Sequence, residues 1–263
     1  MKNSKPARRR CAQPLFDHWD DFAVRARRAR RVLLLLDFDG TLVGFKPKPE
    51  EVELDAPTRR LLARLARDSR VTLGFVSGRR RADVRRRVGV RGAQYYGLHG
   101  WESRPAMCLK GAPRKLLDAA RAELAARIEG LPGVWLEDKQ AGLVLHYRES
   151  PQAAARRARE AARAVVGHFA PHLRGLSGKK ICELLPADLP GKGHAVARVA
   201  SSYGPDTLTI YAGDDTTDES VFAALKDGVT IHVGSNPKTQ ARYCVRTPRE
   251  MKLFLERLEA LLS

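Results

Sequence analysis

The sequence has few aromatic residues, few cysteines and no long apolar run. Aromatic residues make up 6% of it and do not interleave with the basic clusters, which argues against rings that stack on single-stranded nucleic acid. The four cysteines lie far apart with no C-x-x-C pair, so we expect free thiols in a reducing, cytoplasmic compartment. The longest apolar run, Val32–Leu36, is far too short to cross a membrane, and we expect no signal peptide.

Positive charge is present in excess. The 263 residues include 48 Lys and Arg against 30 Asp and Glu, a formal net charge of +18. Such an excess favours a phosphorylated or polyanionic partner. The basic residues are nevertheless spread along the chain, often beside alanine, as in residues 153–163. We therefore interpret them mainly as solvated helix faces and expect no nucleic-acid partner and no membrane partner.

Two parts of the chain alternate short apolar runs with helical patterns. Polar residues and then a helical pattern follow each of the apolar runs Val32–Leu36 and Val71–Val76. The same arrangement occurs later, at residues 208–212 and 229–233. Apolar runs of this length are typical of strands that are buried on both faces of a parallel sheet. The pattern predicts an α/β fold with a doubly wound, Rossmann-like core.

Between the two parts the order helix, strand, strand occurs twice, which predicts a small inserted α+β cap. We therefore divide the chain into a basic N-terminal extension (1–30), the first half of the core (31–104), the cap (105–188) and the second half of the core (189–263). A helix is expected over residues 16–31, without an assigned role.

The first strand ends in Asp37-Phe38-Asp39-Gly40-Thr41. Residues two apart on an extended segment point the same way, so Asp37 and Asp39 can converge on one site. Carboxylates this close need a cation between them or a proton on one of them. One could then act as a nucleophile and the other as a general acid and base. The alternative is a structural acidic turn.

Polar groups also follow the other strands. Ser77, in Ser77-Gly78-Arg79, could bind a phosphate oxygen or cap the next helix. The dense acidic segment 213–219 could bind Mg²⁺, or Asp218 could cap a helix over residues 219–225. Lys192 offers a cation for a phosphate, and the G-x-x-x-x-G-K-[ST] pattern of a P-loop is absent there.

Together, D-x-D-G-T, S-G-R, a lone lysine and G-D-D-x-x-D occur in an order that resembles the haloacid-dehalogenase superfamily of phosphotransferases, over about 31–104 and 190–263. The resemblance implies that Asp37 is the nucleophile and Asp39 the general acid and base, while Ser77 and Lys192 bind the phosphoryl group. It also implies a Mg²⁺ site formed by Asp37, the backbone carbonyl of Asp39, and Asp214, with Asp215 and Asp218 orienting these ligands.

Three segments of the expected cap, at 136–139, 146–148 and 178–183, resemble the trehalose-6-phosphate phosphatases, as does His99-Gly100-x-Glu102. That resemblance implies trehalose 6-phosphate as the substrate. It implies substrate contacts from Arg79, His99, Gly100, Glu102, Glu137, Lys139, His146, Arg148, Lys179 and Glu183. From the residues alone, Lys179 and Glu183 share one strand face and could bind sugar hydroxyls or form a cross-strand ion pair.

Two other functions stay open at this point. The chain could be a phosphatase for another sugar phosphate, such as sucrose, mannosylglycerate or hexose phosphate. It could instead be a non-catalytic, basic regulatory protein on the same scaffold. We expect a monomer.

Overall fold

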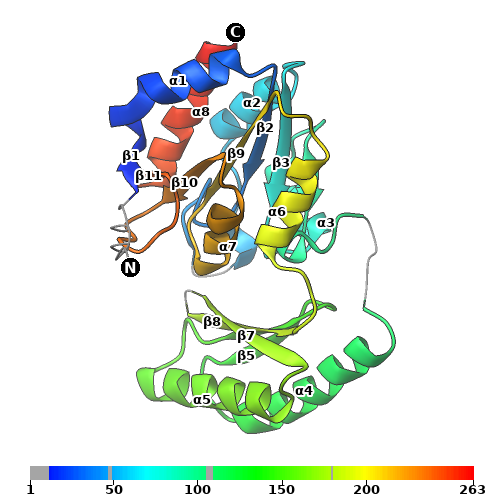
Figure 1. Ribbon diagram of the computed structural model, residues 1–263. Coiled ribbons are helices and arrows are strands. Elements are labelled where there is room, and N and C mark those ends of the chain that lie inside the picture. Colours follow the sequence, from blue (N-terminus) through cyan, green and yellow to red (C-terminus); the bar gives the residue numbers. More distant parts are fainter. Residues whose placement is uncertain (1–11, 47–48, 105–108, 179) are drawn as a thin grey trace, which may run out of the picture.

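The computed structural model describes residues 12–46, 49–104, 109–178 and 180–263, which form a core and a cap (Figure 1). The core sheet is parallel throughout, in the order β1-β11-β10-β9-β2-β3-β4. Its strands are β1 (Gln13–Pro14), β2 (Arg31–Leu36), β3 (Val71–Val76), β4 (Gln94–Tyr96), β9 (Thr207–Gly213), β10 (Val229–Val233) and β11 (Tyr243–Val245).

Helices cover both faces of this sheet, because its central strands are apolar on both sides. In β2, Leu34 and Leu36 join a cluster with helices α1 (Trp19–Arg28), α2 (Ala56–Leu65), α3 (Arg81–Val88) and α8 (Pro248–Leu262). Leu33 and Leu35 join the opposite cluster with α6 (Lys192–Ser201) and α7 (Thr216–Ala224). Single 3₁₀ turns lie at Leu15–His18, Pro49–Glu51 and Leu98–Gly100. The predicted doubly wound α/β core is confirmed.

The described part of the segment expected as an extension, residues 1–30, packs on the core. Gln13 of β1 is in register with Tyr243 of β11, and the fully buried Phe22 of α1 contacts Phe254 of α8 with 5.3 Å between ring centroids. The α-helix begins at Trp19, after a 3₁₀ turn, and ends at Arg28 because β2 begins three residues later. The sequence analysis missed β1 and β11, since two and three residues are too few to show a pattern.

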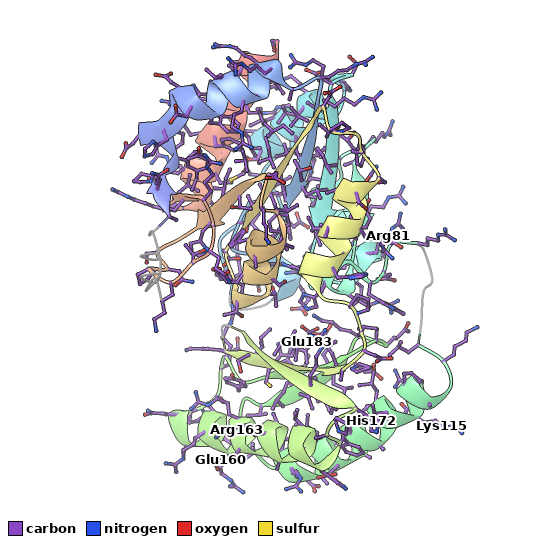
Figure 2. All side chains as sticks on the ribbon, in the orientation of Figure 1. Arg81, Lys115, Glu160, Arg163, His172 and Glu183 are labelled. Carbon is purple, nitrogen blue, oxygen red and sulfur yellow. The ribbon has the colours of Figure 1, made fainter. Side chains whose placement is uncertain are left out.

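The cap is a four-stranded antiparallel sheet in the order β5-β6-β8-β7, with two helices on one face. Its elements are α4 (Ala112–Ile128), β5 (Trp135–Asp138), β6 (Leu143–His146), α5 (Gln152–His168), β7 (Leu173–Gly178) and β8 (Ile181–Pro186). Helix, strand, strand therefore occurs twice, and the predicted α+β cap is confirmed. Figure 2 shows Glu183 on the side of this sheet that faces the core, whereas Glu160 and Arg163 lie on the far side with α5.

The cap lies over the carboxyl ends of the central core strands (Figure 1). Strands β3, β2 and β9 are neighbours in the sheet, so the residues that follow them meet at one edge. A cavity of about 860 Å³ separates this edge from the cap sheet. None of the helices in the described ranges has the length and apolar character that a membrane span requires.

Candidate active site

Three buried aspartates converge at the floor of the cavity, where Asp37 and Asp214 belong to its lining and Asp218 lies behind them. Asp37 follows β2, Asp214 follows β9 and Asp218 lies in the first turn of α7. One carboxylate oxygen from each lies within 4.8 Å of the others, a spacing that a single cation can bridge. The sequence analysis predicted that Asp37 and Asp214 lie together. They do so because β2 and β9 are neighbouring parallel strands, which end at the same edge of the sheet.

Lys192, the first residue of α6, is the cation inside this cluster. Its Nζ donates to Oδ1 of Asp37 at 2.7 Å and to Oδ1 of Asp218 at 2.8 Å. Burial alone would lower the pKa of Lys192, but the charges of Asp218 and Asp37 raise it well above its usual value. Lys192 thus contacts two of the three buried carboxylates that converge here.

Asp37 is held from two sides. The residue is 4% exposed, and Thr41 Oγ1 donates to its Oδ2 at 3.2 Å while Lys192 contacts Oδ1. Burial raises its pKa well above the usual range, Lys192 opposes that rise, and the charges of Asp218 and Asp214 add to it. A divalent cation at this point would favour the ionised form that a nucleophile needs. The carboxylate oxygens, which lie within 4.8 Å of one another, are donors that fit a divalent metal.

Gly40 leaves room for Asp214. Its φ is +85°, and a Cβ atom at this position would collide with the carboxylate of Asp214. Glycine is therefore required here both for the backbone conformation and for the close approach of a metal-ligand candidate.

Asp218 is already fully engaged by the protein. Its two oxygens accept hydrogen bonds from four donors: Lys192 Nζ, the hydroxyl of Tyr211, and the backbone N–H groups of Asp214 and Asp215. These bonds counter the effect of burial and lower the pKa of Asp218. The arrangement suits a group that orients Asp214 and Lys192 rather than one that binds a metal directly.

Asp215 and Asp218 also start α7. The helix begins at Thr216, so the predicted helix over 219–225 was placed three residues late, and Asp215 is the N-cap with Asp218 as its capping-box partner. Asp215 accepts a hydrogen bond from Thr216 N–H at 2.7 Å and lines the cavity.

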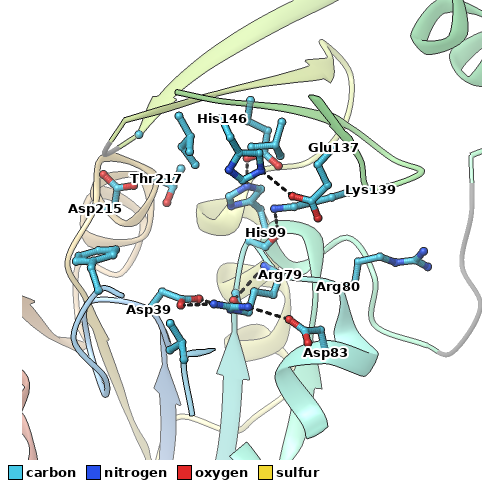
Figure 3. Close-up of a pocket in the computed structure, with 18 of the residues that line it drawn as sticks. Asp39, Arg79, Arg80, Asp83, His99, Glu137, Lys139, His146, Asp215 and Thr217 are labelled. Carbon is cyan, nitrogen blue, oxygen red and sulfur yellow. Dashed lines mark hydrogen bonds and ion pairs between the residues drawn. The ribbon is translucent and has the colours of Figure 1, made fainter. Parts of the chain in front are cut away.

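Asp39, the predicted general acid and base, is held by an arginine (Figure 3). Arg79 Nε and Nη2 donate to its two oxygens at 2.6 and 2.7 Å, and Nη1 donates to Asp83 at 2.9 Å. Burial would lower the pKa of Arg79, but these hydrogen bonds raise it. Burial would likewise raise the pKa of Asp83, yet bonds from Arg87, Arg86 and Arg79 lower it to about 2. Arg79 thus contacts the predicted acid and base, Asp39, directly.

Ser77 lies at the cavity wall and is almost completely buried. Its Oγ accepts a hydrogen bond from Arg79 N–H at 3.1 Å. It does not cap α3, whose N-cap is Arg80 without a side-chain hydrogen bond. The hydroxyl can donate to a phosphate oxygen in this position.

Cap and core are joined by hydrogen bonds across the cavity. His99 Nε2 lies 2.5 Å from Glu183 Oε2, and Lys139 Nζ donates to the carbonyl of Gly78 at 3.0 Å. Burial would raise the pKa of Glu183, but the nearby charges of His99 and Lys139 lower it to about 2. Glu137 Oε2 pairs with His146 Nε2 at 2.9 Å within the cap, as Figure 3 shows. These five predicted residues therefore lie together.

The other predicted substrate contacts lie differently. Arg148 lines the cavity and donates to the carbonyl of Lys46 at 2.7 Å, a further contact between cap and core. Gly100 does not line the cavity, because it packs tightly against Ala195. Glu102 is also outside the lining, and its carboxylate accepts hydrogen bonds from Arg81 N–H and Arg80 at the start of α3. Lys179 lies outside the described residues.

The sequence analysis missed four residues of this site. Thr41 belongs to the first motif and could have been found from it. Tyr211 had no signal, since it lies inside an apolar strand. Asp83 lies four residues after Arg79 and Trp135 directly precedes the segment 136–139, so both could have been found from the helix and strand periods beside these motifs.

Comparison with known proteins agrees with this geometry. A family model described as trehalose-phosphatase matches residues 35–250. A trehalose-phosphate phosphatase of Mycobacterium avium (strain 104) is 34% identical over 247 residues, which cover 87% of this chain and 62% of that protein. The trehalose 6-phosphate phosphatase RA3 of Zea mays is 29% identical, with 89% of this chain and 72% of that protein covered.

Solved structures share the fold. The C-terminal domain of trehalose-6-phosphate phosphatase from C. albicans superposes with a TM-score of 0.82 at 21% identity, covering 95% of this chain and 99% of that one. The chain spans less than two thirds of the length of the mycobacterial relative. Since the family model extends over both halves of the core and the cap between them, the chain belongs to the trehalose-phosphatase family.

Proposed function

We propose that this chain hydrolyses trehalose 6-phosphate to trehalose and phosphate with the help of Mg²⁺. The observation that carries the proposal is the position of Asp37. This buried carboxylate, held by Lys192 and Thr41, lies at the floor of a cavity whose roof carries Glu137, Lys139 and Glu183 of the cap. Nucleophile and sugar-binding groups thus face one enclosed space.

In the proposed reaction, Asp37 attacks phosphorus and forms an aspartyl phosphate, while Asp39 protonates the departing sugar oxygen. Asp39 then takes a proton from the water that hydrolyses this intermediate. Lys192 and Ser77 bind the phosphoryl oxygens. Mg²⁺, held by Asp37, Asp214 and the backbone carbonyl of Asp39, would supply positive charge to the transferred group.

The cap binds the sugar in this proposal. Carboxylates of Glu137 and Glu183 accept hydrogen bonds from hydroxyl groups, and Lys139 donates to them. The hydrogen bonds from His99 to Glu183 and from Lys139 to Gly78 join cap to core and keep bulk water from the reacting atoms. Roles for Arg148 and Lys179 stay predictions, as do the monomeric state and the cytoplasmic location.

Phosphate release from a panel of sugar phosphates, with Mg²⁺ and with excess chelator, tests the proposal. We expect trehalose 6-phosphate to be hydrolysed at least about 10-fold faster than glucose 6-phosphate or sucrose 6-phosphate, and only with the metal. Faster turnover of sucrose 6-phosphate or a hexose phosphate would assign a different substrate. Full activity in the chelator would contradict the role of the aspartate cluster.

Substitution of the nucleophile separates catalysis from binding. Asp37→Asn keeps the size of the side chain and should abolish turnover without unfolding the protein. Activity within about 10-fold of the unsubstituted protein would remove Asp37 as the nucleophile.

A further inference from the structure

Trp135 leaves much of its side chain in contact with solvent. It is 46% exposed, whereas most large apolar side chains of the described residues are buried. Among the described residues three others have comparable exposure. Val24 and Leu253 lie on α1 and α8, away from the cavity, whereas Phe45 also lines it, with the guanidinium of Arg148 5.5 Å from its ring centroid. Trp135 lines the cavity. A large exposed apolar side chain in this place needs an explanation that Val24 and Leu253 do not.

The register of the cap sheet puts Trp135 on the face that carries the sugar-binding candidates. Its cross-strand neighbours form the row Trp135, His146, Ile181 and Gly178. The parallel row on the same face is Glu137, Val144, Glu183 and Leu176. Since alternate residues of a strand share a face, a carboxylate row and an aromatic row lie side by side over the cavity.

The indole ring has a fixed orientation. It stacks on the imidazole of His146 with 3.7 Å between centroids and 6° between planes. His146 is in turn held by the hydrogen bond to Glu137 (Figure 3). One face of the indole is thus covered by a ring that the structure orients, and the side chain is pre-organised for a ligand on its remaining surface.

A pyranose matches such a surface. Its rim of hydroxyl groups is polar, and its C–H groups form two apolar faces. A flat aromatic ring can cover one such face while neighbouring carboxylates bind the rim, which is the combination of apolar and directed polar contacts that small-molecule sites use.

Depth in the cavity indicates which ring Trp135 would bind. Asp37 at the floor is 4% exposed and Glu183 in the roof is 5% exposed, whereas Trp135 at the start of the edge strand β5 is 46% exposed. A phosphate on Asp37 and Lys192 therefore lies deep, and Trp135 lies at the mouth. A monosaccharide phosphate would fill the deep part alone.

We propose that Trp135 stacks on the sugar ring that does not carry the phosphate, and so selects disaccharide phosphates over monosaccharide phosphates. This inference rests on the proposed function, because it assumes that the phosphate binds at Asp37. It assigns Trp135 a specificity role and no part in the chemical step.

Steady-state kinetics of Trp135→Ala and Trp135→Phe test it on trehalose 6-phosphate, glucose 6-phosphate and p-nitrophenyl phosphate. We expect Trp135→Ala to lower kcat/KM for the disaccharide phosphate about 10-fold, mainly through KM, and to leave the two smaller substrates within about twofold. Trp135→Phe keeps an aromatic face and should retain most of the activity. Leu253→Ala, which shortens an exposed side chain on α8, should change nothing.

A binding readout without turnover completes the test. Trehalose titrated into the protein should change the tryptophan fluorescence, and this change should be lost in Trp135→Phe, which keeps Trp19 and Trp101. Equal losses of kcat/KM on all three substrates, or a fluorescence change that persists in Trp135→Phe, would overturn the inference.

The two proposals fail in different ways. If the unsubstituted protein prefers trehalose 6-phosphate and Trp135→Ala keeps that preference, only the role of Trp135 is wrong. If sucrose 6-phosphate is the better substrate and Trp135→Ala removes that preference, the substrate assignment is wrong and the role of Trp135 holds. A preference of the unsubstituted protein for glucose 6-phosphate contradicts both.

Discussion

Replacing Lys192 with methionine should destabilise the metal-free protein strongly. The substitution keeps most of the aliphatic side chain and removes the ammonium group that contacts Asp37 and Asp218, both of which are buried. Removing one partner of a buried ion pair costs about 3–5 kcal/mol. For a chain of this size each kcal/mol lowers the melting temperature by about 2–4 °C, so we expect a decrease of about 6–20 °C.

The variant also has a characteristic pH dependence. Burial raises the pKa of Asp37, and without Lys192 the opposing attraction is lost. A folded-state pKa above the unfolded value means that the folded state binds the extra proton, so stability rises as the pH falls toward the unfolded value near 4. The pH values of about 7.5 and about 5.5 both lie above the unfolded pKa of an aspartate. Between them, Lys192→Met should therefore recover more stability on acidification than the unsubstituted protein does.

Thermal denaturation in chelator, at both pH values and again with added Mg²⁺, measures these effects. Mg²⁺ should restore part of the lost stability, because a bound cation replaces the missing charge. Lys226→Met, which removes an exposed lysine after α7, is the control and should stay within about 2 °C. A melting temperature of Lys192→Met within about 2 °C of the unsubstituted protein in chelator would refute the reasoning.

Three further substitutions test single contacts. Gly40→Ala should lower metal-dependent activity by about 100-fold, because a Cβ atom at this position would collide with Asp214. Gly44→Ala is the control and should be neutral, since the space around Gly44 is open. Equal effects of the two substitutions on activity would contradict this reasoning. Glu183→Gln should lower kcat/KM for trehalose 6-phosphate about 10-fold or more and leave p-nitrophenyl phosphate nearly unchanged; matching losses would exclude a sugar contact. Arg79→Lys replaces a two-pronged contact with Asp39 by a single one and should lower kcat about 10-fold with little change in KM. Arg64→Lys is the control, because Arg64 makes a similar two-pronged contact with Glu259 at the exposed surface and its substitution should leave kcat unchanged. If Arg79→Lys changes only KM, Arg79 is a substrate contact instead.

Much of the fold could be predicted because its signals are local. Apolar strands such as Val71–Val76 and the repeated order of helix and strands in the cap show their periods within a few residues. The short strands β1 and β11 show no pattern because they have only two and three residues, and β1 pairs with a partner more than 200 residues away in the chain, as Gln13 does with Tyr243. The start of α7 was placed late because Asp218 was considered as the cap, whereas the hydrogen bonds make Asp215 the N-cap and Asp218 its capping-box partner.

The sequence by itself determined which chemical groups follow the core strands, namely the carboxylates of Asp37 and Asp214 and the hydroxyl of Ser77, and that the ammonium of Lys192 stands at the start of a helix. Spacing along a strand is set by backbone geometry, so residues next to a buried strand must appear at the sheet edge. Only the tertiary structure decided how these groups are used. Lys192 meets Asp37 across 155 residues of chain, and Asp218 is taken up by four protein donors.

The same holds for the residues that face the sugar. The structure ties Asp39 to Arg79, removes Gly100 and Glu102 from the cavity lining and adds Trp135 to it. The contact of Asp39 with Arg79 and the exclusion of Gly100 and Glu102 depend on packing within the core, whereas the place of Trp135 depends on the position of the cap over the core. Both arise from contacts between segments that are separated in the chain.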